Sequence, residues 1–313
     1  MRYGWAVKSP EPALARPTLD EATVRLRAAG LLAPDESRAT GTGDRSGRDD
    51  SAGPADATAS AGLRIVGAPW GAVRRTLAGA GFADVGPAAG GTGHRFAAYD
   101  PGLDRWLRLD LTPLSPEATS RESARPRTGL TVAILGPDGA GKTTLTEAIA
   151  GSFSLPVRRL YAGLYPADRR RFRLPGLETL AVLARQLRLT IEAARQRRRG
   201  ALVLFDRFAY DARLPLPPGA GRRSRLRRAL IARSSSTPDL VVVLDAPVDV
   251  LVGRREEHSR EVIEAQRTRY AELARAVPDG VVVDARPEAD AVRRAVTALI
   301  WSRVVERGRT DDD

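Results

Sequence analysis

A glycine-rich run ending in a lysine and two threonines occupies residues 136–144, and it reads Gly-Pro-Asp-Gly-Ala-Gly-Lys-Thr-Thr. Glycines let the main chain curl so that several N–H groups point at one anion. A helix beginning there adds its positive end. The lysine can reach the outer phosphates of a nucleotide, and the first threonine can give its hydroxyl to Mg²⁺. We therefore predict a phosphate-binding loop with an exposed lysine, formed by Gly136, Asp138, Gly139, Ala140, Gly141, Lys142, Thr143 and Thr144.

Two aspartates follow apolar runs, at the point where a strand would end. Asp206 comes after residues 201–205, and Asp245 comes after residues 240–244. Ligands of open α/β sheets gather at the carboxyl ends of strands. We favour Asp206 as the metal carboxylate, because Arg207 follows it and could hold an anionic acceptor. We interpret Asp245 as a helix cap, since a proline opens the next helix.

These side chains need a scaffold of strands that alternate with helices. Continuous apolar runs, typical of parallel strands covered on both faces, predict strands at 131–135, 157–161, 201–205, 240–244 and 281–283. Helices are predicted at 142–150, 177–198, 223–234, 247–256, 260–276 and 287–306. The alternation indicates a doubly wound α/β domain, with a parallel five-stranded sheet, over residues 129–309.

The chain before residue 129 divides by composition. We predict an N-terminal segment at 1–33, a disordered linker at 34–62, a small α+β domain at 63–112, a second linker at 113–128, and an acidic tail at 310–313. In the small domain we expect strands at 63–66, 94–99 and 106–111, and a helix at 70–80.

Composition narrows the function classes. The formal net charge is +12, but lysine occurs only at positions 8 and 142. The arginine excess is not interleaved with aromatics, so we attribute it to composition and to a site for phosphorylated small molecules, and we expect no nucleic-acid partner. The chain has no cysteine, so it has neither disulfides nor a thiolate metal site. No run is long and apolar enough to span a bilayer, and we expect a cytoplasmic protein without a membrane partner.

The sequence resembles the thymidylate kinase-like branch of the P-loop nucleoside monophosphate kinases. The resemblance covers roughly residues 129–306 and rests on the glycine loop, on Asp206-Arg207-Phe208, on residues 238–247 and on residues 254–270. It implies a P-loop NTPase fold with strand order 2-3-1-4-5. It also implies transfer of the ATP γ-phosphoryl group, with Mg²⁺, to a nucleoside monophosphate. Asp138 would face the acceptor sugar and Arg207 the acceptor phosphate.

The same resemblance implies a mobile lid whose arginines close over ATP. Arg254 and Arg260 would bind the nucleotide, Arg255 would act in the transfer, and Arg267 lies on the following helix. Thymidylate kinases are often dimers, so the resemblance allows a homodimer. The family's Thr-Arg-Glu-Pro stretch is absent, and residues 158–173, which are rich in arginine, stand in its place. The resemblance therefore does not identify the acceptor of the phosphoryl group.

The small domain faintly resembles the nucleotidyltransferase-like domains that sometimes precede such kinases. The resemblance lies in residues 77–82, 94–100 and 106–111, with Asp110 where a strand carboxylate could stand. There is no Asp-x-Asp pair, and two-metal chemistry needs clustered carboxylates. We interpret the domain as degenerate and noncatalytic, with Asp110 as a surface or capping residue and His94 as structural.

Three readings of the whole chain stay open at this point. The first is a kinase of a phosphorylated small molecule, with Lys142, Asp206, Arg207 and Arg255 as catalytic residues. The second is a P-loop regulator that binds ATP without transferring its phosphate to a small molecule. The third is a polynucleotide-binding ATPase or a polynucleotide kinase, and either would show salt-dependent nucleic-acid binding. A sugar-phosphate kinase, with a sugar phosphate in place of a nucleotide as the acceptor, would fall under the first reading.

Overall fold

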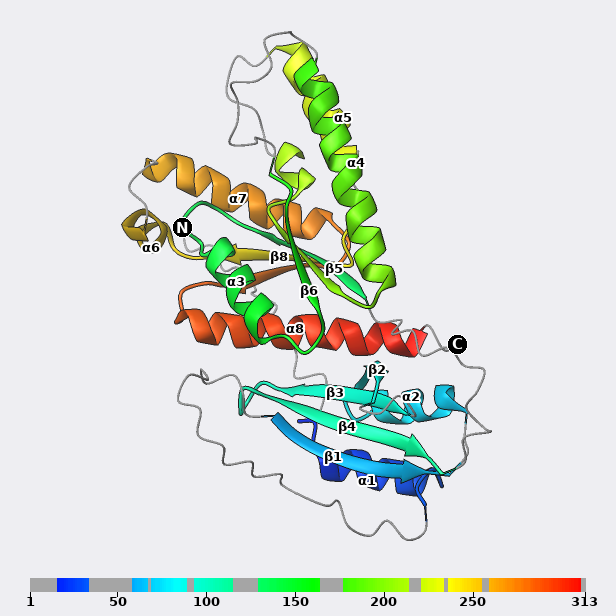
Figure 1. Cartoon of the computed structure of the whole chain (residues 1–313). Coiled ribbons are helices and arrows are strands. Elements are labelled where there is room, and N and C mark those ends of the chain that lie inside the picture. Colours follow the sequence, from blue (N-terminus) through cyan, green and yellow to red (C-terminus); the bar gives the residue numbers. More distant parts are fainter. Residues whose placement is uncertain are drawn as a thin grey trace, which may run out of the picture. The chain divides into compact units, whose positions relative to one another are not determined.

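The computed structural model describes two compact units (Figure 1). The described residues are 16–33, 58–66, 69–88, 93–114, 129–163, 177–213, 221–233, 236–254 and 259–310. One unit comprises Leu130–Gly151 and Val157–Val296, and we call it the P-loop unit. The other comprises Pro10–Gly129, Ser152–Pro156 and Thr297–Asp313, and we call it the N-terminal unit.

The P-loop unit is built on a parallel five-stranded sheet in the order β6-β7-β5-β8-β9. Counted along this unit from β5, the order is 2-3-1-4-5. The strands are β5 (Leu130–Leu135), β6 (Val157–Tyr161), β7 (Leu202–Asp206), β8 (Leu240–Asp245) and β9 (Gly280–Asp284). The helices are α3 (Lys142–Ser152), α4 (Leu177–Arg198), η3 (Ala209–Arg213), α5 (Arg222–Arg233), α6 (Val248–Arg254) and α7 (Arg260–Ala276). Helix α8 (Ala289–Thr310) begins in this unit, and its residues from Thr297 onward belong to the N-terminal unit.

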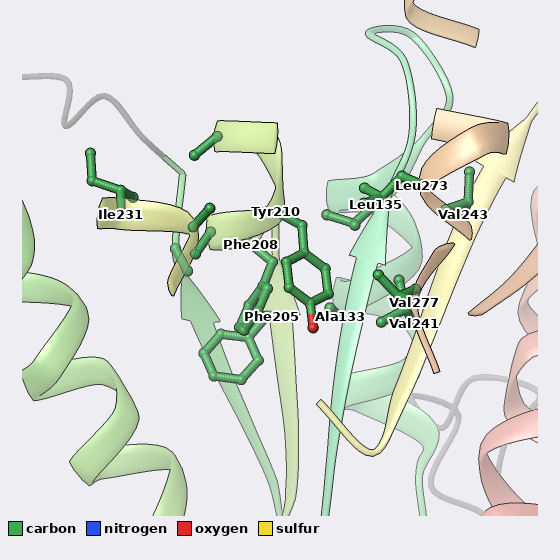
Figure 2. Close-up of a cluster of buried hydrophobic side chains, with 14 of the residues drawn as sticks. Ala133, Leu135, Phe205, Phe208, Tyr210, Ile231, Val241, Val243, Leu273 and Val277 are labelled. Carbon is green, nitrogen blue, oxygen red and sulfur yellow. The ribbon is translucent and has the colours of Figure 1, made fainter. Parts of the chain in front are cut away.

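Alternate residues of the central strands point to opposite faces of this sheet. On one face, Ala133, Phe205 and Val243 belong to a core to which α4, η3, α5 and α7 contribute (Figure 2). In Figure 1, α3 runs along the other side of the sheet. Because the central strands are buried on both faces, each reads as a continuous apolar run. This confirms the α/β fold with a parallel five-stranded sheet.

The N-terminal unit has a four-stranded mixed sheet in the order β1-β4-β3-β2. Strand β1 pairs with β4 in parallel, and β2, β3 and β4 pair antiparallel. Its elements are α1 (Leu19–Ala28), β1 (Thr58–Ile65), α2 (Trp70–Ala78), β2 (Ala83–Pro87), β3 (His94–Asp100) and β4 (Arg105–Pro113). The core of this unit joins the buried faces of α1 and α2 to β1, β3 and β4.

Several predicted boundaries of the N-terminal unit were wrong. Strand β1 begins at Thr58, inside the predicted disordered linker, because pairing with β4 along its whole length compensates for its small side chains. The predicted N-terminal segment contributes Leu26 to the core, and its Leu32 bridges to Ile65. Residues 297–309 group with this unit rather than with the P-loop unit. Residues 34–57, 115–128 and 311–313 lie outside the described residues.

The described helices include none with the length and apolarity needed to cross a bilayer.

Candidate active site

The glycine loop connects the end of β5 to the start of α3. Gly136 has a φ of 140°, and a Cβ there would lie 2.4 Å from the carbonyl oxygen of Leu244 on the neighbouring strand. Gly139 and Gly141 both have a φ of 84°. Left-handed backbone of this kind favours glycine. The loop therefore takes a conformation that needs its glycines, and it curls directly before the N-terminus of α3.

Lys142, the first residue of α3, is buried rather than exposed as we expected, with a relative accessible surface of 7%. Its Nζ donates hydrogen bonds to the carbonyl oxygens of Gly136 (3.0 Å) and Pro137 (2.8 Å), and it lies 3.8 Å from Asp138 Oδ1. Burial, and next the positive charge of Arg207, lower the pKa of Lys142 to about 8. The ammonium group is thus folded back onto the loop's own carbonyl groups.

Thr143 and Asp206 meet across the gap between α3 and β7. Thr143 Oγ1 donates to Asp206 Oδ2 at 2.8 Å, and Asp206 ends β7 beside Ile134 of β5. A hydroxyl and a carboxylate are oxygen ligands of the kind Mg²⁺ uses. Asp245 is held differently, because Arg267 donates to both of its carboxylate oxygens, at 2.8 and 2.9 Å. Asp245 is therefore the partner of an arginine, and our interpretation of it as a helix cap was wrong.

Arg207 projects from the end of β7 to the phosphate loop. Its φ is 65°, which is uncommon for a residue other than glycine. Its Nη2 donates to Asp138 Oδ1 at 2.5 Å, and the main-chain N–H of Asp138 donates to Gln266 Oε1 at 3.3 Å. The two residues that the resemblance assigned to the acceptor are thus joined to each other.

Two further residues near Arg207 escaped the sequence analysis. Asp211, on η3, is buried and accepts a hydrogen bond from Tyr270 Oη at 3.0 Å. Burial raises the pKa of the Asp211 carboxyl, and Arg207 opposes that rise. Burial, followed by the charge of Asp211, raises the pKa of Tyr270. No local sequence pattern marks this pair, because its members lie 59 positions apart.

A cavity of about 510 Å³ lies at the phosphate loop. It is lined by the loop from Asp138 onward, by the start of α3, and by Tyr161, Asp206, Arg207, Arg254 and the segment that leads into α8. Arg254 Nη1 donates to the carbonyl oxygen of Ala285 at 3.2 Å, so α6 and the end of β9 meet at the cavity.

The predicted lid arginines do not all come to this cavity. Arg260 is exposed and pairs with Asp249 at 2.6 Å, and it is absent from the cavity lining. Arg267 is engaged by Asp245. Arg255 lies outside the described residues. Of the described arginines Arg254, Arg260 and Arg267, only Arg254 lines the cavity.

Comparisons with known proteins match the P-loop unit. The family model described as "AAA domain" matches residues 131–291. A thymidylate kinase of Pseudomonas entomophila (strain L48) is 32% identical over 211 residues, which cover 58% of this chain and 99% of that protein. A thymidylate kinase of Pseudomonas putida (strain GB-1) is 30% identical over 209 residues, with coverage of 58% and 99%. The chain belongs to the thymidylate kinase-like family of P-loop kinases.

Solved structures of two kinases are similar to this thymidylate kinase-like chain over 55% and 53% of its length. A thymidylate kinase from Candida albicans is similar with 16% identity and a TM-score of 0.41, over 55% of this chain and 89% of that one. A deoxyadenosine kinase from M. mycoides is similar with 14% identity and a TM-score of 0.42, over 53% and 96%.

ATP and Mg²⁺ are the cofactors of thymidylate kinase-like enzymes, and the described residues fit both. The described part of the chain has no group of three or more His, Cys, Asp or Glu that could cage a metal ion by itself. Mg²⁺ suits such a site, because it keeps several waters and binds through one or two protein oxygens plus phosphates. Thr143 and Asp206, hydrogen-bonded at the phosphate loop, are the oxygens placed for this.

Proposed function

We propose that the protein transfers the γ-phosphoryl group of ATP to a phosphorylated small molecule, and that this acceptor is a nucleoside monophosphate such as thymidylate. The observation that carries the proposal is the placing of Arg207 in the same cavity as the phosphate loop and the Thr143–Asp206 pair. Phosphoryl transfer needs aligned phosphates and neutralised charge more than covalent chemistry by the protein. Three positively charged side chains line the cavity, those of Lys142, Arg207 and Arg254.

Each group has a role in this proposal. Lys142 exchanges its carbonyl partners for the outer phosphates of ATP, and Thr143 and Asp206 hold Mg²⁺. Arg207 binds the acceptor phosphate, and a planar guanidinium suits a phosphate because it can donate two parallel hydrogen bonds. Asp138 faces the acceptor sugar. Arg254, which also lines the cavity, contacts the nucleotide, whereas a contribution of Arg255 stays a prediction.

We also propose that the N-terminal unit does not transfer nucleotides. Asp110 is not a cap, because it accepts two hydrogen bonds from Arg95, at 2.7 and 2.9 Å. Asp84, which the sequence analysis overlooked, binds Arg74 at 3.0 Å and His94 Nδ1 at 2.8 Å. Carboxylates held by cationic side chains are poorly placed to hold two metal ions. The predicted structural role of His94 agrees with its buried contact to Asp84.

A homodimer is a further proposal. Leu180, Leu187 and Ile191 are exposed along α4 at helical spacing, which supplies an apolar stripe for a second copy. Light scattering of the purified protein measures the mass directly. A monomer at micromolar concentration would contradict the dimer and leave the proposed activity untouched.

The kinase proposal is tested by measuring ADP release with a panel of nucleoside monophosphates, sugar phosphates and nucleosides. We expect turnover with monophosphates, thymidylate among them, and none with nucleosides. Arg207→Ala should raise the acceptor KM at least about tenfold, because it removes a charged hydrogen bond, while ATP binding persists. Arg25→Ala, on the exposed face of α1, is the matched control. An ATP-binding regulator would instead show no acceptor-dependent ADP release.

A further inference from the structure

Asp211 is a buried acidic residue beside the acceptor arginine, and it does not line the cavity. Its carboxylate interacts electrostatically with the guanidinium of Arg207 and with the ammonium group of Lys142. A buried carboxylate is costly unless positive charge and hydrogen bonds compensate for the lost water. The positive charges next to Asp211 are those of Arg207 and Lys142, which both line the cavity.

Three contacts fix Asp211 in place. Its main-chain N–H donates to the carbonyl oxygen of Phe208 at 3.0 Å, and its own carbonyl oxygen accepts from Arg228 Nη2 at 2.7 Å. Its side chain accepts from Tyr270 Oη at 3.0 Å. Tyr270 is itself buried, on α7. The carboxylate of Asp211 thus has a defined orientation, which Tyr270 sets.

Arg207 needs support of this kind. Its backbone is left-handed, and its guanidinium donates to Asp138 on the phosphate loop. Asp138 contacts this guanidinium directly. Asp211 lies in η3, which begins two residues after Arg207, and its hydrogen bond from Tyr270 ties this turn to α7. We propose that Asp211 and Tyr270 are positioning residues that hold the Arg207 guanidinium at the phosphate loop, ready for the acceptor phosphate. The inference rests on the proposed function, because it assigns the pair to acceptor binding.

Helix α7 supports both sides of Arg207. Gln266 accepts from the N–H of Asp138, and Tyr270, one turn later, donates to Asp211. Between them, Arg267 ties the helix to Asp245 at the end of β8. The proposal therefore makes α7 a determinant of acceptor binding.

The test compares Tyr270→Phe, Asp211→Asn and the double variant, with thymidylate as the probe. Each single change should raise the KM for thymidylate about tenfold, with the KM for ATP changed less than about twofold, because one hydrogen bond or charge at the acceptor side is lost. The double variant should be no worse than Asp211→Asn, since Tyr270 acts through Asp211. Tyr99→Phe, which removes a tyrosine–aspartate hydrogen bond in the N-terminal unit, is the matched control and should change neither KM.

Equal losses for ATP and thymidylate, or unchanged kinetics, would overturn the proposal, as would single effects that multiply in the double variant. Crystal structures of the wild type and both single variants give a readout independent of turnover. The Arg207–Asp138 hydrogen bond should be lost in both variants, and its retention in both would also overturn the proposal. If the wild type does not turn over thymidylate, the proposed function has failed for that acceptor, and the crystal structures alone decide the positioning role.

Discussion

At the scale of single residues, the site depends on charges that are partly or wholly removed from water. Lys142 is the clearest case, because its ammonium group is buried between loop carbonyls and has only a distant carboxylate for a partner. Its retention in a chain with one other lysine fits a role in binding phosphate. A buried lysine of this kind loses its proton more readily than an exposed one.

This predicts a pH dependence of the ATP reaction. Burial and Arg207 lower the pKa of Lys142 to about 8. In the free enzyme Lys142 is therefore fully charged well below that pH, and it loses its charge as the pH rises through the pKa. The kcat/KM for ATP should therefore decline above about pH 8, since this constant reports groups of the free enzyme. Lys142→Arg keeps its charge to much higher pH, and its residual activity should lack this decline. Steady-state rates across the alkaline range check both statements, and an identical alkaline decline in the two proteins would refute the assignment.

At the scale of elements, the phosphate loop is shaped by strand β8 as well as by its own sequence. A Cβ on Gly136 would meet the carbonyl oxygen of Leu244 at 2.4 Å, and its φ of 140° suits only glycine. Gly136→Ala should therefore lower the free energy of unfolding by at least about 2 kcal/mol and abolish ATP binding. Gly151→Ala is the matched control, because this helical glycine has open space around it, and alanine there should stabilise by up to about 1 kcal/mol. Urea unfolding and nucleotide titration measure both, and equal behaviour of the two variants would contradict this account of the loop.

The same scale shows what could be read from the sequence. The buried strands β5, β7 and β8 can be recognised in the sequence as apolar runs. Asp206 directly follows one of these runs and could therefore be placed at a strand end. The part of strand β1 that precedes Leu63 could not be recognised, because Thr58–Gly62 are small residues whose pairing with β4 decides their conformation. The contacts of Asp211 with Tyr270 and of Asp138 with Gln266 span 59 and 128 positions. Such contacts are set by the packing of α7 and leave no local pattern.

At the scale of the whole molecule, each unit has an apolar core among its described residues. Leu26 on α1 is fully buried in the core of the N-terminal unit. Leu26→Ala should cost that unit about 2–5 kcal/mol through lost burial and the cavity left behind. Hydrogen exchange followed by mass spectrometry should show faster exchange in β1, β3 and β4 and little change in β5, β7 and β8. Equal acceleration in both sets of strands would show that the two cores unfold as one.

The net charge of +12 also belongs to the whole molecule. Many described arginines are already engaged, as Arg95, Arg207 and Arg267 are by aspartates. Each such ion pair is neutral as a whole, so the excess of +12 remains, and the phosphate-binding cavity takes up part of it through Lys142 and Arg254. The family assignment explains the P-loop unit, whereas in the N-terminal unit Asp84 and Asp110 are both paired with arginines.

The central claim is that the loop around Lys142 binds the phosphates of ATP for transfer. It is tested most directly by the rate of ADP release from Lys142→Ala with thymidylate as acceptor, beside the wild type and Lys8→Ala, which removes the chain's other lysine. Removing one charge that stabilises the transferring group should cost a factor of about 100 or more in kcat/KM. Circular dichroism should show the fold retained, and Lys8→Ala should match the wild type. A folded Lys142→Ala protein that works at the wild-type rate would contradict the account.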